Sequence, residues 1–368
     1  MHAVDLLSEW KQACRFPARL RLYAARGLAG LAPEARWVDA TAEQRLAAAQ
    51  AAAVSAPGRS VAVLSGDEVI APGVLEALPR LQGVDILSDR VAPVRTDHWH
   101  RVDSLPWDAT TAPAVGIAPV HLPGLLAWES QERPLEDLSG EHPRIVIADH
   151  DRTWSSFART PFGILVLAAA AEQGLRPVVG VTGASIGSWW DTLAAIGRRQ
   201  LPCCLRVSGA VPPYGWWRSL PGWWVTAPSP LSLRGVVARA VGSRDTVAII
   251  EPGAEEPDQE GHEPGNGRWW LAVDDARVAI VAPGRARDPA LEAVAALTAL
   301  GLPCAAWELT SIVPLALPPP DLPLVVVEGD LEGLGDAVRA ERGPEVPVLH
   351  EGATIADIAA AVRGVVGA

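Results

Sequence analysis

The sequence predicts an α/β protein made of three doubly wound, mostly parallel-sheet domains. Short apolar runs typical of buried strands alternate with longer Ala- and Leu-rich segments typical of helices. Alternating strands and helices favour a parallel sheet with helices on both faces. A length of 368 residues, 49% of them apolar and 20% charged, provides enough chain for two or three such domains.

Composition argues against several classes of partner. The net charge of −12 has no basic block to offset it, so binding to nucleic acid or to an anionic membrane is disfavoured. The four cysteines are scattered and indicate neither a disulfide framework nor a zinc site. No apolar run approaches the roughly 20 residues that span a bilayer. We therefore expect a soluble, cytoplasmic protein.

Residues 1–142 form the first predicted domain. An Ala-rich helix follows Glu43, and a strand that begins at Ser60 leads into the turn Gly66-Asp67-Glu68 and a helix that ends near residue 78. A Gly-Asp turn at a strand end suits Mg²⁺ and a diphosphate, because the carboxylate binds the ion while backbone N–H groups face the phosphates.

Residues 143–251 form the second predicted domain, in which the alternation is regular. Its helix at 162–173 is Ala-rich and is followed by Gly174, a residue typical of helix ends. The pattern predicts strands at 144–148, 177–181, 201–207, 223–226 and 246–251, and helices at 162–173, 186–200 and 230–241.

Residues 252–270 are predicted to be a linker, because most of this segment is rich in Pro, Gly and acidic residues and has little to bury. Residues 271–368 then form the third domain. Its pattern predicts strands at 277–282, 304–309 and 324–328, and helices at 288–300, 333–341 and 355–366.

Three passages carry a family resemblance. Residues 160–179 (TPFGILVLAAAAEQGLRPVV) resemble a helix and strand of the pyrimidine-binding domain in transketolases, deoxyxylulose-phosphate synthases and 2-oxoacid dehydrogenase β subunits. Residues 220–235 (LPGWWVTAPSPLSLRG) resemble a later passage of that domain, and residues 324–338 (LVVVEGDLEGLGDAV) resemble the transketolase C-terminal domain. The resemblance implies a transketolase-like fold and a site for thiamine diphosphate with Mg²⁺.

The resemblance also shows where the chain departs from the family. The Glu that protonates the aminopyrimidine ring in the family falls at Thr160, which cannot transfer that proton. An aromatic that stacks on the ring is missing from residues 183–187, where only Ile186 could pack against it. The loop at 208–217 lacks the family's substrate-binding His. The departures indicate an eroded cofactor site.

The identity of residues 1–142 stays open between three interpretations. In a diminished diphosphate-binding domain, Gly66 and Asp67 would hold the cofactor, Asp67 and Asp89 would bind Mg²⁺, and Glu68 would crowd the diphosphate. In a second pyrimidine-like unit, Glu43 would be the activating acid. In the third interpretation, Glu43 only begins a helix, where an acid favours the helix dipole.

Two further features are candidates for sites or contacts. His150 follows a predicted strand end, where α/β proteins place ligands, and is the one His that we would test. His98 and His100 could meet a metal, but no third ligand is evident and a surface loop is the better interpretation. Four Trp-Trp pairs, three of them in residues 143–251, favour packing and subunit contact.

Two functions remain open from the sequence. The first is a pseudoenzyme, a non-catalytic or repurposed subunit that forms a homodimer or a heteromer with a transketolase-like or E1-type subunit. The second is an active thiamine-diphosphate-dependent transferase or 2-oxoacid dehydrogenase β-type subunit, which uses Glu43 as a relocated acid or a separate diphosphate-binding subunit. The substrate does not follow from the sequence.

Overall fold

The structure is a computed structural model. It describes residues 6–7, 9–10, 20–24, 36–37, 41–55, 59–66, 68–70, 72–81, 83–103, 105, 125–128, 145–148, 161–172, 176–251, 267–350 and 352–367. Asp67, His150 and Thr160 lie outside the described residues. The chain divides into two compact units, one of Met1–Val179 with Leu201–Cys203 and one of Gly180–Gln200 with Cys204–Ala368.

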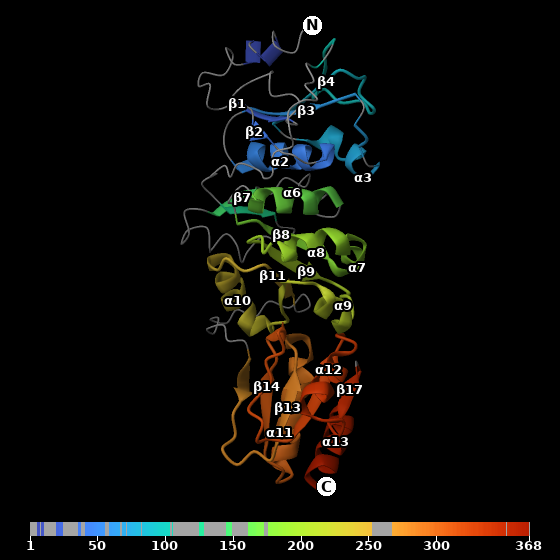
Figure 1. Ribbon diagram of the computed structural model, residues 1–368. Coiled ribbons are helices and arrows are strands. Elements are labelled where there is room, and N and C mark those ends of the chain that lie inside the picture. The colour runs from blue at the N-terminus through green and yellow to red at the C-terminus, as the bar shows by residue number, and fades with distance from the viewer. Residues whose placement is uncertain are drawn as a thin grey trace. The chain divides into compact units, whose positions relative to one another are not determined.

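The first unit contains a five-stranded parallel sheet (Figure 1). On one face, the side chains of Leu6, Leu7 and Trp10 complete an apolar core with residues of the strands, among them Val61, Val63 and Leu87. The Ala-rich helix α2 (Ala42–Ser55) packs against the sheet as well. The strand order is β2 (Arg36–Trp37), β1 (Leu20–Ala24), β3 (Arg59–Leu64), β4 (Val84–Ser88) and β5 (Trp99–Arg101). The turns after β3 contain α3 (Pro72–Leu75) and a short 3-10 helix (Leu78–Arg80).

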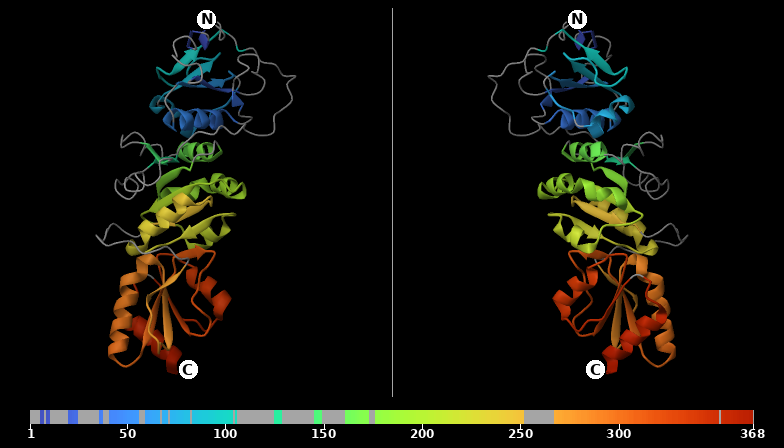
Figure 2. Two further views of the ribbon diagram at one scale, coloured as in Figure 1. Left: turned by 90° about the vertical axis from the view of Figure 1, so that its left-hand side faces the viewer. Right: turned by 90° about the vertical axis from the view of Figure 1, so that its right-hand side faces the viewer.

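Helix α2 also packs against α6 (Pro161–Glu172), and the two helices lie side by side (Figures 1 and 2). Both helices are Ala-rich, and small side chains let helix backbones approach closely. Helix α2 begins with a capping box, in which Thr41 N donates to Gln44 Oε1 and Gln44 N donates to Thr41 Oγ1. The unit also holds the parallel strands β6 (Leu125–Trp128) and β7 (Ile145–Ala148).

The second unit contains a further sheet, whose strands lie in the order β15-β10-β11-β9-β8. Strand β11 pairs in parallel with β9 and with β10, whereas β15 pairs antiparallel with β10. The strands of this unit are β8 (Val178–Thr182), β9 (Cys204–Ser208), β10 (Trp224–Thr226), β11 (Val247–Ile250) and β15 (Ser311–Val313). The helices between them are α7 (Gly183–Ile186), a 3-10 turn (Gly187–Trp189), α8 (Trp190–Arg198), α9 (Tyr214–Ser219) and α10 (Pro230–Gly242).

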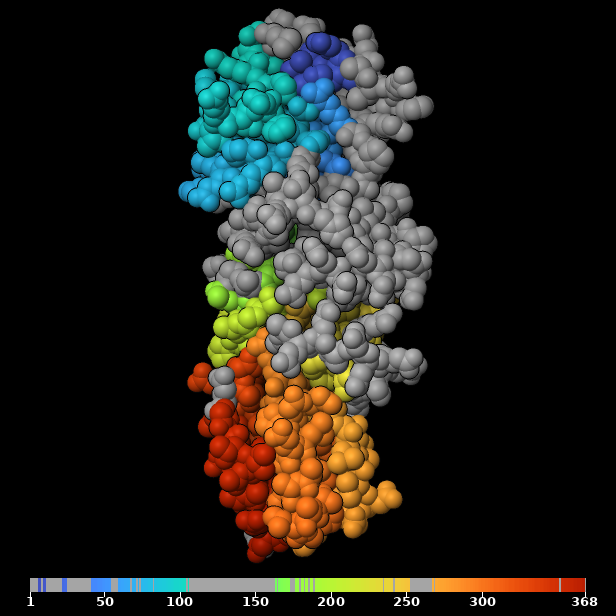
Figure 3. Space-filling model, turned by 180° about the vertical axis from the view of Figure 1, so that it is seen from behind, coloured from blue at the N-terminus to red at the C-terminus, as the bar shows by residue number. Residues whose placement is uncertain are grey.

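The same unit contains a third sheet, with α11 and α12 on opposite faces (Figure 2). Helices α11 and α13 share one apolar core with the sheet, and Figure 3 shows orange atoms of α11 beside red atoms of the C-terminal segment. The strand order is β12 (Arg268–Leu271), β14 (Cys304–Glu308), β13 (Val278–Ala282), β16 (Leu324–Gly329) and β17 (Val348–His350). The helices are a 3-10 turn (Gly284–Ala286), α11 (Arg287–Ala299), α12 (Leu334–Arg342) and α13 (Ile355–Gly367).

The predicted α/β class is confirmed by these sheets and the helices between them. Several details differ from the predicted elements, among them the following. Strand β12 begins inside the predicted linker, because Trp269 packs against Trp307 with 4.9 Å between the ring centroids. Strand β15 is an unpredicted three-residue edge strand, and the predicted helix at 186–200 is divided at residues 187–189. Among the described residues, no helix is long and apolar enough to cross a membrane.

Candidate functional site

The carboxyl ends of β3 and β4 meet in the first unit, where α/β proteins commonly bind ligands. Gly66 follows β3 and Asp89 follows β4. A Cβ atom on Gly66 would lie 3.0 Å from Asp89 Oδ1, so the structure brings these two predicted site residues together. Asp89 Oδ1 is buried and has no hydrogen-bond partner.

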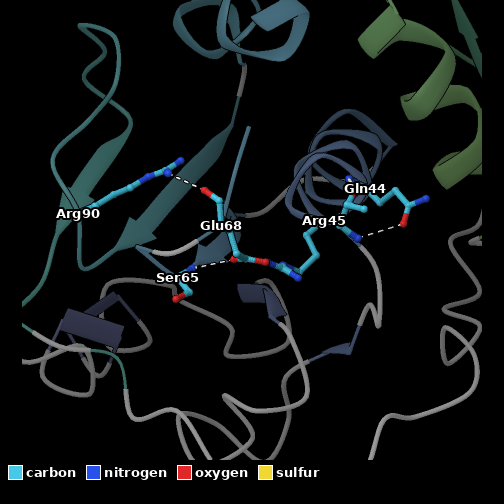
Figure 4. Close-up of polar contacts among 6 residues, drawn as sticks. Gln44, Arg45, Ser65, Glu68 and Arg90 are labelled. Carbon is cyan, nitrogen blue, oxygen red and sulfur yellow. Dashed lines mark hydrogen bonds and ion pairs between the residues drawn. The ribbon is translucent and has the colours of Figure 1, made fainter. Parts of the chain in front are cut away.

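Glu68 turns its side chain back into this strand end (Figure 4). Its Oε2 accepts the backbone N–H of Ser65 at 2.8 Å, and its Oε1 pairs with the guanidinium of Arg45 from α2. Arg90, from the turn after β4, donates to the backbone carbonyl of Glu68 at 2.6 Å. The carboxylate of Glu68 therefore takes the backbone donor that an anionic ligand would use.

Arg45 is the residue of this cluster that sequence reasoning missed. Its side chain is 1% exposed, although Arg is almost never buried without a charged partner. The sequence did contain a sign of this buried charge, since Arg45 lies within a helix whose other buried residues are mainly alanines. Without the structure, however, nothing in the sequence pairs Arg45 with an acid 23 residues further along.

The predicted metal ligands remain a prediction. Asp67 lies outside the described residues, and Asp89 is the described member of the pair. Within the described part of the chain, no group of three His, Cys, Asp or Glu side chains lies close enough to hold a metal ion. Glu43 lies half-buried in the first turn of α2, as expected for an acid that favours the helix dipole.

In the second unit, the turns after β8 and β9 are in direct contact. A Cβ atom on Gly183 would lie only 1.7 Å from the carbonyl oxygen of Ala210, so backbone meets backbone at this point. Ile186, one turn further along α7, is fully buried. Its side chain has no exposed face against which a ring could stack.

Two more carboxylates close strand ends in this unit. Glu308 ends β14, is fully buried, and accepts the backbone N–H of Ser229 at 2.7 Å and the hydroxyl of Ser232 at 2.6 Å. Because Ser229 is the N-cap of α10, Glu308 lies where the helix dipole favours an anion. Glu328 lies one residue before the end of β16 and accepts the N–H of Gly335 at 2.9 Å, in the first turn of α12.

Asp85 forms a separate polar cluster on β4. Its Oδ1 lies 2.8 Å from His100 Nε2, its Oδ2 pairs with Arg59, and that guanidinium lies 4.1 Å from the ring centroid of Trp10. Burial raises the pKa of Asp85, but hydrogen bonds and charge from His100 and Arg59 together outweigh burial and lower the pKa to about 2. The expected loop at His98–His100 is therefore partly strand β5, and its His100 is bonded to a carboxylate.

We expect Asp85→Asn to lower the free energy of unfolding by about 2 kcal/mol at neutral pH, since each pKa unit corresponds to about 1.4 kcal/mol. The pKa of Asp85 falls on folding from 3.8 to about 2, so its contribution is present above pH 3.8 and is lost as the pH falls through about 2. Urea unfolding of both proteins over this range should show the difference shrinking. A difference that stays constant down to about pH 2 would contradict the ion-pair assignment.

The described residues thus define an α/β protein in which carboxylates and backbone of the chain itself occupy the strand ends described above.

No protein-family model and no curated protein matches the sequence. Among solved structures, a transketolase mutant from Pichia stipitis aligns over 56% of this chain and 36% of its own, with 13% identity and a TM-score of 0.48. A split-gene transketolase, solved as an inactive β4 tetramer, aligns over 67% of this chain and 92% of its own, with 21% identity and a TM-score of 0.47.

Transketolase from Leishmania mexicana aligns over 56% of this chain and 36% of its own, with 16% identity and a TM-score of 0.42. The chain therefore spans about a third of the length of the Pichia and Leishmania proteins. Because these sequence identities and TM-scores are low, the α/β assignment rests on the three sheets described above.

Proposed function

We propose that this chain is a transketolase-like protein with an eroded thiamine-diphosphate site, and that it acts as a non-catalytic or repurposed subunit. The family assignment is supported by the passages at 160–179, 220–235 and 324–338. The loss of cofactor chemistry is supported chiefly by one observation, the contact of the Ala210 carbonyl with Gly183.

That contact matters because the family resemblance places the pyrimidine ring near the turns after β8 and β9. A ligand needs an open cleft with converging polar groups. Here the backbones already touch and Ile186 is buried, so this point of contact offers a ring no stacking surface. Thiamine diphosphate does not fit the residues present in this part of the chain.

A second line of support comes from acid/base chemistry. Activation of the cofactor needs a titratable group at the aminopyrimidine, and Thr160 is not titratable at working pH. The alternative acid, Glu43, lies in the first turn of α2, where its charge favours the helix dipole. The alternative of an active enzyme therefore depends on Glu43 as a relocated acid or on a separate diphosphate-binding subunit.

We expect neither the wild-type chain nor Thr160→Glu to catalyse ketol transfer with thiamine diphosphate and Mg²⁺. A single acid restores one group but leaves the closed turns at Gly183 as they are. A coupled assay with a phosphorylated ketose donor and an aldose acceptor measures this. Turnover by Thr160→Glu would show that only the acid had been lost, and turnover by the wild type that is lost in Glu43→Ala would establish the alternative function.

We propose that the partner is a second copy of this chain or a transketolase-like, E1-type subunit. The support is the content of paired tryptophans, since Trp is enriched at interface hot spots. Trp216, for example, lies on α9 and is only half-buried beside Trp217. Light scattering of the purified chain measures its mass, and a monomer at every concentration tested would leave only the heteromer.

A further inference from the structure

A pocket of about 620 Å³ lies at the end of the third sheet where β16 and β17 begin, and we name it the Pro323 pocket. Glu308 and Glu328 lie at the opposite, carboxyl end of their strands. The pocket is therefore separate from the strand ends described above. Its volume falls within the range of about 300–1,000 Å³ that is typical of small-molecule sites.

The wall of the Pro323 pocket is mainly apolar. Pro323 and Pro347 directly precede β16 and β17, and their carbonyls accept the N–H groups of Ala279 at 2.9 Å and Val326 at 3.0 Å. Proline has no N–H of its own, so these positions complete the sheet and leave only ring carbon at the wall. Aliphatic side chains extend the wall at Leu322, Val346 and Val365. Such a wall favours the carbon skeleton of a ligand.

Helix α12 holds two segments of this wall. Arg342, the last residue of the helix, donates to the carbonyl of Pro318, just before the first segment. Arg339 Nε donates to the carbonyl of Val346 in the second segment at 2.9 Å. Both segments are therefore tied to the same helix.

The polar groups of the wall give it a negative balance. Asp321 and Glu345 are exposed lining residues, and neither has a hydrogen-bond or ion-pair partner within the described part of the chain. Arg342 is the one cation of the lining, and it lies at the carboxyl end of α12, where it offsets the helix dipole. Gly364 brings the last turn of α13 to the pocket, with the negative end of a second dipole. Charge complementarity therefore favours a cation.

We propose that the Pro323 pocket binds a small organic cation, a protonated amine with an apolar body. The ammonium group pairs with Asp321 and Glu345, and the body packs on the proline and aliphatic wall. The same two carboxylates disfavour phosphates and other multiply charged anions. The inference goes beyond the proposed function, because it uses none of the residues assigned to the thiamine-diphosphate site.

The test is a titration of the wild-type chain with phenylpropylamine at neutral pH, followed by saturation-transfer NMR. The amine should bind saturably, with a dissociation constant of about 1 mM for a ligand of this size. Phenylpropionate, an aromatic carboxylate of similar size, is the control for charge. It should bind at least about tenfold more weakly, because the wall carries two carboxylates.

Two glycines of α13 provide matched variants. Gly364 lines the pocket and a Cβ on it would meet nothing within 4 Å, so Gly364→Phe should fill the pocket and abolish amine binding. Gly367 is equally open but is not a lining residue, so Gly367→Phe should bind like the wild type. If Gly364→Phe does not fold, Gly364→Leu carries the same comparison.

A third variant tests the charges. Asp321→Asn combined with Glu345→Gln should weaken binding of the amine about fivefold, the scale expected for two exposed ion pairs. Both side chains are exposed, so the fold should be unaffected.

The inference would be overturned by absence of saturable amine binding, by equal binding of phenylpropionate, or by unchanged binding in Gly364→Phe. It would also be overturned if light scattering showed a dimer that Gly364→Phe, but not Gly367→Phe, converts to a monomer, since a second copy would then cover the pocket. These outcomes leave thiamine diphosphate binding unaffected, so the proposed function stands or falls separately.

Discussion

Replacing Gly183 by alanine is expected to lower the free energy of unfolding by about 3 kcal/mol, at the upper end of the usual cost of overpacking. The new Cβ would lie 1.7 Å from Ala210 O and 2.7 Å from Ala210 C, which are backbone atoms and not the end of a flexible side chain. The turn after β9 would have to move. Chemical denaturation of the purified variant measures the loss.

Gly187 provides the matched control, because it lies four residues further along the chain and a Cβ there would meet nothing within 4 Å. Gly187→Ala should therefore be nearly neutral, or slightly stabilising through the lower entropy of the unfolded chain. If Gly183→Ala were as stable as Gly187→Ala, the turn that carries Ala210 could leave the strand end easily. The argument for a closed site would then lose its main support.

Glu308→Ala is expected to cost about 3 kcal/mol, because it leaves buried donors without their acceptor at about 1–3 kcal/mol each. These donors are Ser229 N–H and the Ser232 hydroxyl, at the first turn of α10. Glu308→Gln keeps one carbonyl oxygen and should cost about 1 kcal/mol. Thermal and urea unfolding give both values.

Glu292 is the control for this second prediction, because it is an exposed acid on α11 in the same unit. Glu292→Ala should stay within about 0.5 kcal/mol of the wild type, as is usual for surface substitutions. Equal effects of Glu308→Ala and Glu292→Ala would mean that Glu308 does not cap α10 in solution.

Much of the fold could be predicted because its strands are buried on both faces. All five residues of β13 are buried, and such a continuous apolar run can be recognised without knowledge of its neighbours. Helices α10 and α11 were also predicted to within about one residue at each end. Ser229-Pro230 marks the start of α10, and Gly301 lies just beyond the end of α11. Strand β15 was missed because three residues are too few to show a pattern.

The candidate site was harder to predict, because its contacts join residues far apart in the sequence. That Glu68 would crowd a diphosphate stays a prediction from its position in the turn, and the structure adds that its carboxylate accepts the Ser65 N–H at the strand end. The partnership with Arg45 and the contact of Gly183 with Ala210 depend on how the elements pack. Neither leaves a local signature in composition, periodicity or spacing.

Calorimetric titration of the purified wild-type chain with thiamine diphosphate in the presence of Mg²⁺ tests the eroded site most directly. We predict no saturable binding in the micromolar range where an intact cofactor site would show it. Micromolar, Mg²⁺-dependent binding that is lost in Asp67→Ala or Glu43→Ala would contradict this prediction. It would show that residues 1–142 still hold the cofactor.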